Sequence, residues 1–147
     1  MGHDSDELVA PELSRVDPSF VADVVKSGDK KTLIVDVRDA HEVAEGSIKS
    51  ALNVPSSVFK SEDKSQLDAV IKEQLAGAEQ VVVHCHFSKV RGPTCARALN
   101  ERLKALGLDN APEVKVLAGG VAGFMDSYKG DSEVAVLPAQ GWDPAQK

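Results

Sequence analysis

Three short, β-rich apolar runs constrain the fold of this chain most. Residues 32–37 read TLIVDV, residues 80–83 read QVVV and residues 114–117 read VKVL. A run that is apolar at almost every position is typical of a strand covered on both faces of a parallel sheet. Because helical patterns separate the runs, the strands must be joined by crossovers. The sequence therefore predicts an α/β domain with a mainly parallel central sheet flanked by helices.

The segments between these runs carry helix and strand signals of their own. Asp17 and Pro18 predict the start of a helix that ends at Gly28, and Ser61 predicts the cap of a second helix that ends at Gly77. A third helix is expected from Pro93 to Gly107, and a fourth at residues 121–128, after a glycine turn. Residues 39–45 fit a helix-compatible turn, and residues 51–54 a short strand ahead of a proline.

The length of 147 residues suits one domain with a single core. Residues 1–13 are polar and acidic without an apolar period, so we expect a flexible acidic arm. Residues 14–128 should form the folded domain. Residues 129–147 show no clear period and are expected to be an irregular tail.

Composition excludes several classes of partner. The formal net charge is −6, which does not favour nucleic acid or an anionic membrane surface. The apolar runs are far shorter than a membrane span, and the acidic start lacks the basic and apolar regions of a signal peptide. We expect a cytoplasmic protein, with the nucleus as the alternative, and two free thiols, Cys85 and Cys95. A structural zinc site with four cysteine ligands is excluded, and no metal ligand set is expected.

The central run leads directly into a segment with a candidate reactive cysteine. Residues 80–96 read QVVVHCHFSKVRGPTCA. A strand delivers Cys85 into a short loop, and Arg91 stands six residues later where a helix begins. Loop N–H groups and the positive end of a helix favour an anion at such a place. A cysteine attacks only as the thiolate, which the same groups stabilise, and the planar guanidinium of Arg91 matches two oxygens of a tetrahedral anion.

Three segments resemble the rhodanese superfamily. Residues 84–93, HCHFSKVRGP, look like the active loop of its cell-cycle dual-specificity phosphatases and of the eukaryotic arsenate reductases that share the fold. Residues 36–55 are similar to the family segment that runs D-x-R, E, G-H-I, A, N and P, and residues 116–124 resemble its final L-x-G-G segment. The resemblance covers most of residues 14–128 and implies a rhodanese-like three-layer catalytic domain.

The resemblance also implies roles for particular residues. Cys85 would be the nucleophile and Arg91 the oxyanion clamp. The oxyanion-binding loop would consist of His86, Phe87, Ser88, Lys89, Val90 and Arg91. Independently of the resemblance, we expect Asp36 and Arg38 to join the sheet edge to the loop, and His84 to have a structural, supporting role.

Loop length and loop composition guide the choice of substrate. In this superfamily the sulfur-transferring members have a loop one residue shorter, whereas the longer form found here admits phosphate or arsenate. The cell-cycle phosphatases carry acidic residues where this chain has His86 and Val90, and a second cysteine where it has Val37. General-acid help to an alkoxide leaving group is typically worth about 10² to 10⁴ in rate, so its absence disfavours alkyl phosphate cleavage.

The sequence therefore favours an arsenate reductase with no bound cofactor, coupled to glutathione and a glutaredoxin as the resemblance implies. Phosphatase activity toward a phosphoprotein is the close alternative, and the two activities can coexist. A thiosulfate-type sulfurtransferase and a non-catalytic rhodanese-like binding module carry lower weight.

Several further residues have competing interpretations. Cys95 shares an apolar stripe with Leu99 and Leu103, so we expect a core position rather than a resolving thiol. His86 fits a solvent-facing loop position better than a proton donor, and His41 and Glu42 fit a solvated face.

Overall fold

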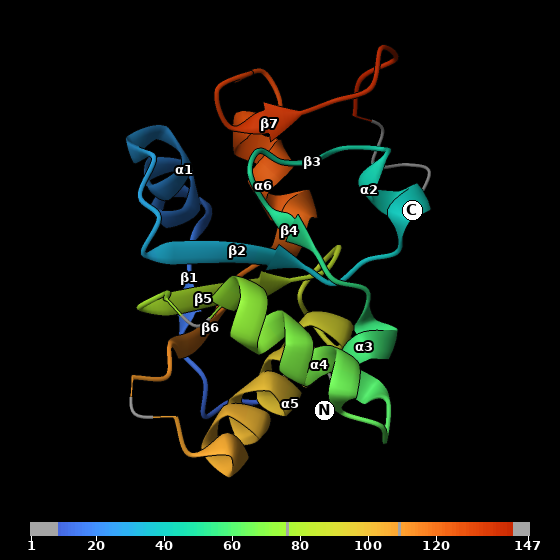
Figure 1. Ribbon diagram of the computed structural model, residues 1–147. Coiled ribbons are helices and arrows are strands. Elements are labelled where there is room, and N and C mark those ends of the chain that lie inside the picture. Colours follow the sequence, from blue (N-terminus) through green and yellow to red (C-terminus); the bar gives the residue numbers. More distant parts are fainter. Residues whose placement is uncertain (1–8, 76, 109, 143–147) are drawn as a thin grey trace, which may run out of the picture.

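The computed structural model describes residues 9–75, 77–108 and 110–142 and is built around a parallel sheet (Figure 1). In the described part of the chain this sheet has five strands, and every neighbouring pair is parallel. Their spatial order is β1 (Arg15–Val16), β6 (Glu113–Leu117), β5 (Gln80–His84), β2 (Thr32–Asp36) and β4 (Leu52–Asn53). The predicted α/β class with a mainly parallel sheet is confirmed.

Helices cover both faces of this sheet (Figure 1). One face carries α1 (Pro18–Ser27) and α6 (Gly120–Tyr128). The other carries α3 (Ser56–Lys60), α4 (Ser65–Val70) with its π-helical continuation η2 (Ile71–Leu75), and α5 (Arg91–Leu106). The short helix α2 (Ala40–Val43) follows β2. The strand β2 points toward the side of the molecule where α2 and α3 lie (Figure 1).

The central strand β5 is buried on both faces, as its apolar run predicts. Val81 and Val83 contribute to the core under α5, and Val82, one residue out of phase, contributes to the core under α6. All three are fully buried. Alternate side chains of a strand point to opposite faces, so this one strand contributes to both cores.

Local capping sets most of the helix ends. The carboxylate of Asp17 accepts a hydrogen bond from the Phe20 N–H at 3.0 Å, and α1 stops at Gly28, whose φ of 69° is left-handed. These were the predicted ends. The helix α5 begins at Arg91, two residues before the predicted start at Pro93, and it ends at Gly107 as predicted.

The predicted start of the second helix, at Ser61, is wrong. Ser61 does not cap the second helix; it ends a separate short helix, α3, and α4 begins at Ser65. The helix α3 is only five residues long, and its buried residue is Phe59. The two apolar residues that pack against the core, Val58 and Phe59, are adjacent, so this short segment has no helical period to detect in the sequence.

The two ends of the chain are more ordered than the sequence suggests. Within the expected arm, Ala10 and Leu13 are buried, and the guanidinium of Arg15 donates to the carbonyls of Val9, Ala10 and Leu13. Residues 1–8 of that arm lie outside the described residues. Within the expected tail, β7 (Ala135–Val136) pairs antiparallel with β3 (Ser47–Ile48), so this part is not irregular.

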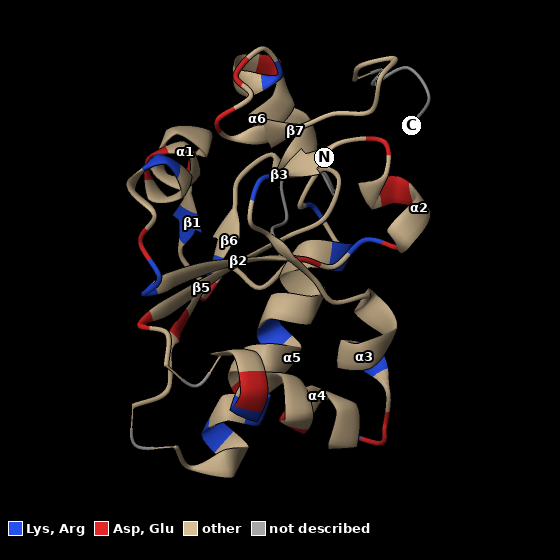
Figure 2. Cartoon of the chain, turned by 45° about the horizontal axis from the view of Figure 1, so that its top comes forward, with Lys and Arg blue, Asp and Glu red and all other residues tan. Residues whose placement is uncertain are grey.

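Charged residues of both signs are interspersed on the outside of the molecule. Residues of both signs occur in and around α1 and in α5 (Figure 2). Among the described helices, none has the length and apolar character needed to cross a bilayer.

Candidate active site

The Cys85 loop begins at the carboxyl end of the central strand. The strand β5 lies between β6 and β2, and all three run in the same direction, so their ends and the segments that follow them meet at one edge of the sheet. In open α/β sheets this edge is where ligands bind. The loop then passes into the first turn of α5.

Backbone donors surround the sulfur of Cys85. Its Sγ accepts hydrogen bonds from the N–H of Ser88 at 3.2 Å and from the N–H of Gly92 at 3.1 Å. A Cβ at Gly92 would lie 3.2 Å from this sulfur and 3.0 Å from the Cys85 nitrogen, so the close approach requires a glycine. Two backbone N–H groups therefore converge on one sulfur.

Neighbouring elements hold the loop from behind. The N–H groups of Val121 and Ala122, at the start of α6, donate to the carbonyls of Cys85 and His86 at 3.1 and 2.9 Å. Ser88 adopts a left-handed φ of 56°, which is unusual for a residue other than glycine. The surrounding hydrogen bonds keep the loop in this conformation, with its N–H groups directed at the sulfur.

Arg91 makes an ion pair that the sequence did not predict. Its Nη1 and Nη2 donate to the two carboxylate oxygens of Glu42 at 2.8 and 3.0 Å. The side chain of Glu42 is only 19% exposed, so the expectation that Glu42 belongs to a solvated face is wrong. This bond with Arg91 is the main reason why the pKa of Glu42 is lowered to about 2. The carboxylate is therefore ionised and is not a proton donor.

The supporting residues Asp36 and Arg38 form a buried ion pair next to the loop. Arg38 Nε lies 2.9 Å and Nη2 2.7 Å from the two oxygens of Asp36, and both side chains are fully buried. His84 is also fully buried; its Nδ1 donates to the Cys85 carbonyl at 3.0 Å, and its Nε2 lies 4.0 Å from Asp36. These three residues connect the ends of β2 and β5.

Of the remaining loop side chains, three are exposed and one is buried. Phe87 and Val90 are 53% and 63% exposed and give the mouth of the loop an apolar rim, and Lys89 is also exposed. The Lys89 Nζ lies 6.0 Å from the centre of the Phe87 ring. His86, which was expected to face solvent, is instead buried against the edge of the Phe87 ring. Burial is the main cause that lowers the pKa of His86.

A residue of the tail completes this wall of the site. Trp142 stacks on His86 with ring centroids 5.7 Å apart and also packs against Gly46. Sequence analysis left this segment without a role. The available signal was the single tryptophan of the chain, since tryptophan buries a large apolar area wherever it finds a surface.

Cys95 lies on α5 and is fully buried in the core on that face of the sheet, as expected. Burial raises the pKa of its thiol to about 11, so it stays protonated near neutral pH.

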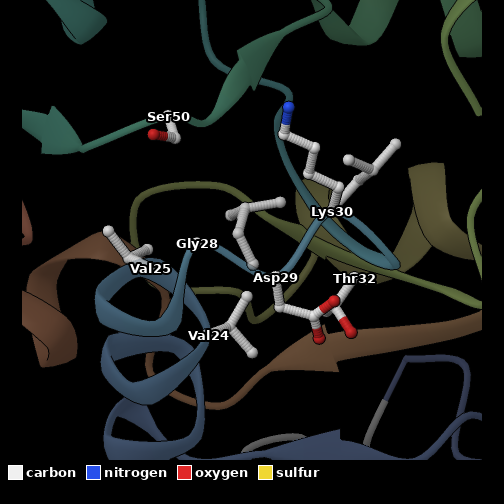
Figure 3. A pocket seen from close by; sticks show the side chains of 9 residues that line it. Val24, Val25, Gly28, Asp29, Lys30, Thr32 and Ser50 are labelled. Atoms are coloured by element: carbon white, nitrogen blue, oxygen red, sulfur yellow. The ribbon is translucent and has the colours of Figure 1, made fainter.

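A cavity of about 270 Å³ lies elsewhere, at the opposite edge of the sheet (Figure 3). It is lined by the end of α1, including Val24 and Val25, by the start of β2 at Thr32, and by Ser50. Its lining includes neither Cys85 nor Arg91, so it is separate from the thiol loop.

Comparison with known proteins agrees with this geometry. Dual specificity phosphatase ibp1 of Schizosaccharomyces pombe is 29% identical over 133 residues, covering 80% of this chain and 92% of the relative. Dual specificity phosphatase Cdc25 of Arabidopsis thaliana is 34% identical over 113 residues, covering 74% and 71%.

Solved structures share the fold. A yeast protein tyrosine phosphatase of the rhodanese family superposes with a TM-score of 0.73 at 25% identity, covering 91% of this chain and 96% of that one. The As-Sb reductase of Leishmania major gives a TM-score of 0.66 at 24% identity, covering 92% and 90%. The family model of the rhodanese-like domain matches residues 21–127. The chain therefore belongs to the rhodanese-like domain family.

Proposed function

We propose that this chain is a cysteine-dependent phosphatase that acts on aryl phosphate monoesters of the phosphotyrosine kind. The observation that carries the proposal is the sulfur of Cys85, which accepts two backbone N–H groups at the end of the central strand. The same donors, with the guanidinium of Arg91, suit the non-bridging oxygens of a tetrahedral phosphate. The phosphatase relatives support the reaction class.

The reaction has two balanced steps. The thiolate of Cys85 attacks phosphorus and forms an S–P bond while the P–O ester bond breaks, releasing a phenolate. Water then cleaves the S–P bond, which gives inorganic phosphate and restores the thiol. Arg91 and the loop N–H groups stabilise the charge that spreads over the phosphoryl oxygens in both steps.

Two features favour an aryl leaving group. In the described part of the site, Glu42 is ionised and the ring nitrogens of His86 are buried, so neither is placed to give a proton to an alkoxide. A phenolate leaves without such help far more readily than an alkoxide does. Phe87 and Val90 are exposed at the mouth of the loop, where an aromatic ring attached to the phosphate would contact them.

Arsenate reduction is the second candidate, and the sequence favoured it. The tetrahedral arsenate anion suits the same donors, and thiolate attack on arsenic would release water or hydroxide. Glutathione and a glutaredoxin would then supply the electrons that give arsenite. The exposed apolar side chains of Phe87 and Val90 would make no favourable contact with an inorganic anion. For this reason we place the phosphatase first.

The test compares substrates and variants in one series. We expect turnover of p-nitrophenyl phosphate, at least about 10²-fold slower turnover of an alkyl phosphate such as β-glycerophosphate, and no turnover by Cys85→Ser. The control Cys95→Ala removes the other, buried thiol and should keep the parental rate.

Other outcomes would replace the proposal. Turnover of arsenate with glutathione and glutaredoxin, without phosphatase activity, would identify a reductase. Efficient formation of thiocyanate from thiosulfate and cyanide would identify a sulfurtransferase. No turnover of any substrate would indicate a binding module.

A further inference from the structure

Only one edge of the Arg91 guanidinium is used by the ion pair with Glu42. Nη1 and Nη2 each donate one hydrogen, at 2.8 and 3.0 Å. A guanidinium has five N–H donors in one plane, so Nε–H and one hydrogen on each Nη stay free of this pair. The contact therefore fixes the plane and direction of the guanidinium without exhausting its donors.

Glu42 is itself held by the scaffold that follows β2. Its Oε1 also accepts the Asp39 N–H at 3.1 Å. The buried Arg38 donates to the backbone carbonyls of Glu42 at 3.1 Å and of Gly46 at 2.8 Å, and Asp36 fixes Arg38 in turn. A continuous series of hydrogen bonds thus runs from the end of β2 to the carboxylate of Glu42.

The backbone of Arg91 lies next to the thiol loop. Arg91 is in the first turn of α5, and the N–H of the next residue, Gly92, contacts the sulfur of Cys85 at 3.1 Å. The pKa of Arg91 is raised mainly by its hydrogen bonds with Glu42, and the charge of Cys85 adds to the shift. The ion pair with Glu42 therefore fixes the guanidinium of a residue that stands beside the thiol.

We propose that Glu42 is a positioning residue that holds the guanidinium of Arg91 beside Cys85, ready for an oxyanion. This inference rests on the proposed roles of Cys85 and Arg91. An arginine side chain has high rotamer entropy, and this one is 29% exposed. Without Glu42 it would turn toward water, and the site would lose an aligned donor and a positive charge next to the thiolate.

The sign of one measurement distinguishes positioning from simple charge compensation. If Glu42 only neutralised Arg91, its removal would leave a stronger positive charge beside the thiolate and would stabilise it. If Glu42 holds Arg91 in place, its removal lets the positive charge move away and destabilises the thiolate. The pH at which iodoacetamide alkylates Cys85 at half its maximal rate reports this difference without any substrate.

The test uses Glu42→Gln in a Cys95→Ala background, so that Cys85 is the thiol that is read. Glutamine keeps the shape and the acceptor for Asp39 but loses the charge. We expect the alkylation midpoint to move to higher pH and kcat/KM for p-nitrophenyl phosphate to fall about 10-fold or more. A midpoint that is unchanged or moves to lower pH would overturn the proposal.

Three further variants complete the experiment. Glu12→Gln breaks a two-bond pair with Arg97 of the same kind, at 2.8 and 2.9 Å on the exposed surface, and should leave both readouts at parental values. Glu42→Asp keeps the charge but shortens the side chain, so the midpoint should again rise. In an Arg91→Ala background, Glu42→Gln should cause no further rise, because Glu42 acts through Arg91; a further rise would contradict the proposed route.

The alkylation readout also separates this inference from the proposed function. If p-nitrophenyl phosphate is not turned over by the parent protein, the phosphatase proposal fails. The midpoints of the parent and of Glu42→Gln still decide whether Glu42 positions Arg91.

Discussion

Arg38 shows how much order a single side chain provides at this edge of the sheet. It is fully buried, pairs with Asp36, and donates to two backbone carbonyls of the segment that contains α2. Asn53 adds hydrogen bonds to the carbonyls of Asp36 and Arg38 at 3.0 and 2.8 Å. A buried charge is tolerated only when its partners are complete, so each of these contacts matters for stability.

Replacement of Arg38 by methionine should therefore be costly. Methionine fills a similar volume but leaves the carboxylate of Asp36 buried and unpaired. We expect the free energy of unfolding, measured by urea titration, to fall by about 3–5 kcal/mol. The control is Arg102→Met, which breaks an equally short but partly exposed pair with Asp68 and should cost much less. Equal losses in the two variants would contradict this account.

At the residue scale, the sequence predicted the residues of the candidate site but not all of their contacts. Asp36, Arg38, Cys85 and Arg91 stand in local patterns, next to strands and a helix start. Glu42 stands in a polar turn, and its partner Arg91 is 49 positions away, so the sequence does not show that the two residues pair. Such a pair can be recognised only in the folded structure, where the sheet brings both segments to one edge.

At the scale of elements, the start of α6 holds the thiol loop from behind. Gly120 has a left-handed φ of 62°, and a Cβ there would lie 2.4 Å from the His86 carbonyl oxygen and 2.7 Å from that of Cys85. The N–H groups of Val121 and Ala122 reach these same two carbonyls. The glycine therefore permits the contact between helix and loop.

Gly120→Ala should disrupt this contact. The added methyl group strains the left-handed backbone, which costs about 1–2 kcal/mol, and it displaces hydrogen bonds worth about 1 kcal/mol each. We expect a loss of about 2 kcal/mol or more in urea unfolding, together with a loss of p-nitrophenyl phosphate turnover. In the same helix, Gly123→Ala meets only an ordinary contact of 3.7 Å and should be neutral or slightly stabilising. If Gly123→Ala proved as harmful as Gly120→Ala, the clash would not be the cause.

Elements with a strong local pattern were predictable, and elements that depend on distant partners were not. The strand β5 and the helix α1 follow from an apolar run and from caps at Asp17 and Gly28. The strands β3 and β7 have two residues each, and each exists because the other pairs with it. Neither carries a period of its own, so a sequence signal was not available.

At the scale of the whole molecule, the fold places polar groups between two apolar layers. His84 and Asp36 lie at the ends of β5 and β2, in the sheet that helices cover on both sides. Burial is the main cause that lowers the pKa of His84. Burial alone would raise the pKa of Asp36, but the neighbouring His84 and Arg38 more than offset this, and the pKa is lowered.

Both shifts make the folded state less stable in acid. The unfolded chain binds a proton at histidine as the pH falls below about 6.5, and native His84 does so only at lower pH. Stability is therefore present above about pH 6.5 and is lost below it, at up to about 1.4 kcal/mol per pH unit for one group. Asp36 adds a loss of the same sign at lower pH.

Urea titrations between pH 7.5 and 5 measure this loss. His84→Asn, which retains a donor for the Cys85 carbonyl, should give a shallower slope than the parent protein. A slope that is the same in the parent and in His84→Asn would rule out His84 as the source.

The antiparallel pair of β3 and β7 joins two segments that are made at different times during synthesis. The strand β7 pairs with β3 in a second, two-stranded sheet, and Trp142 comes to rest on His86, yet both are made after β5, α5 and β6. During synthesis, the thiol loop and the helix that follows it are therefore present before their aromatic cover exists. The segment with β7 and Trp142 therefore closes this wall of the site after the loop itself has been made.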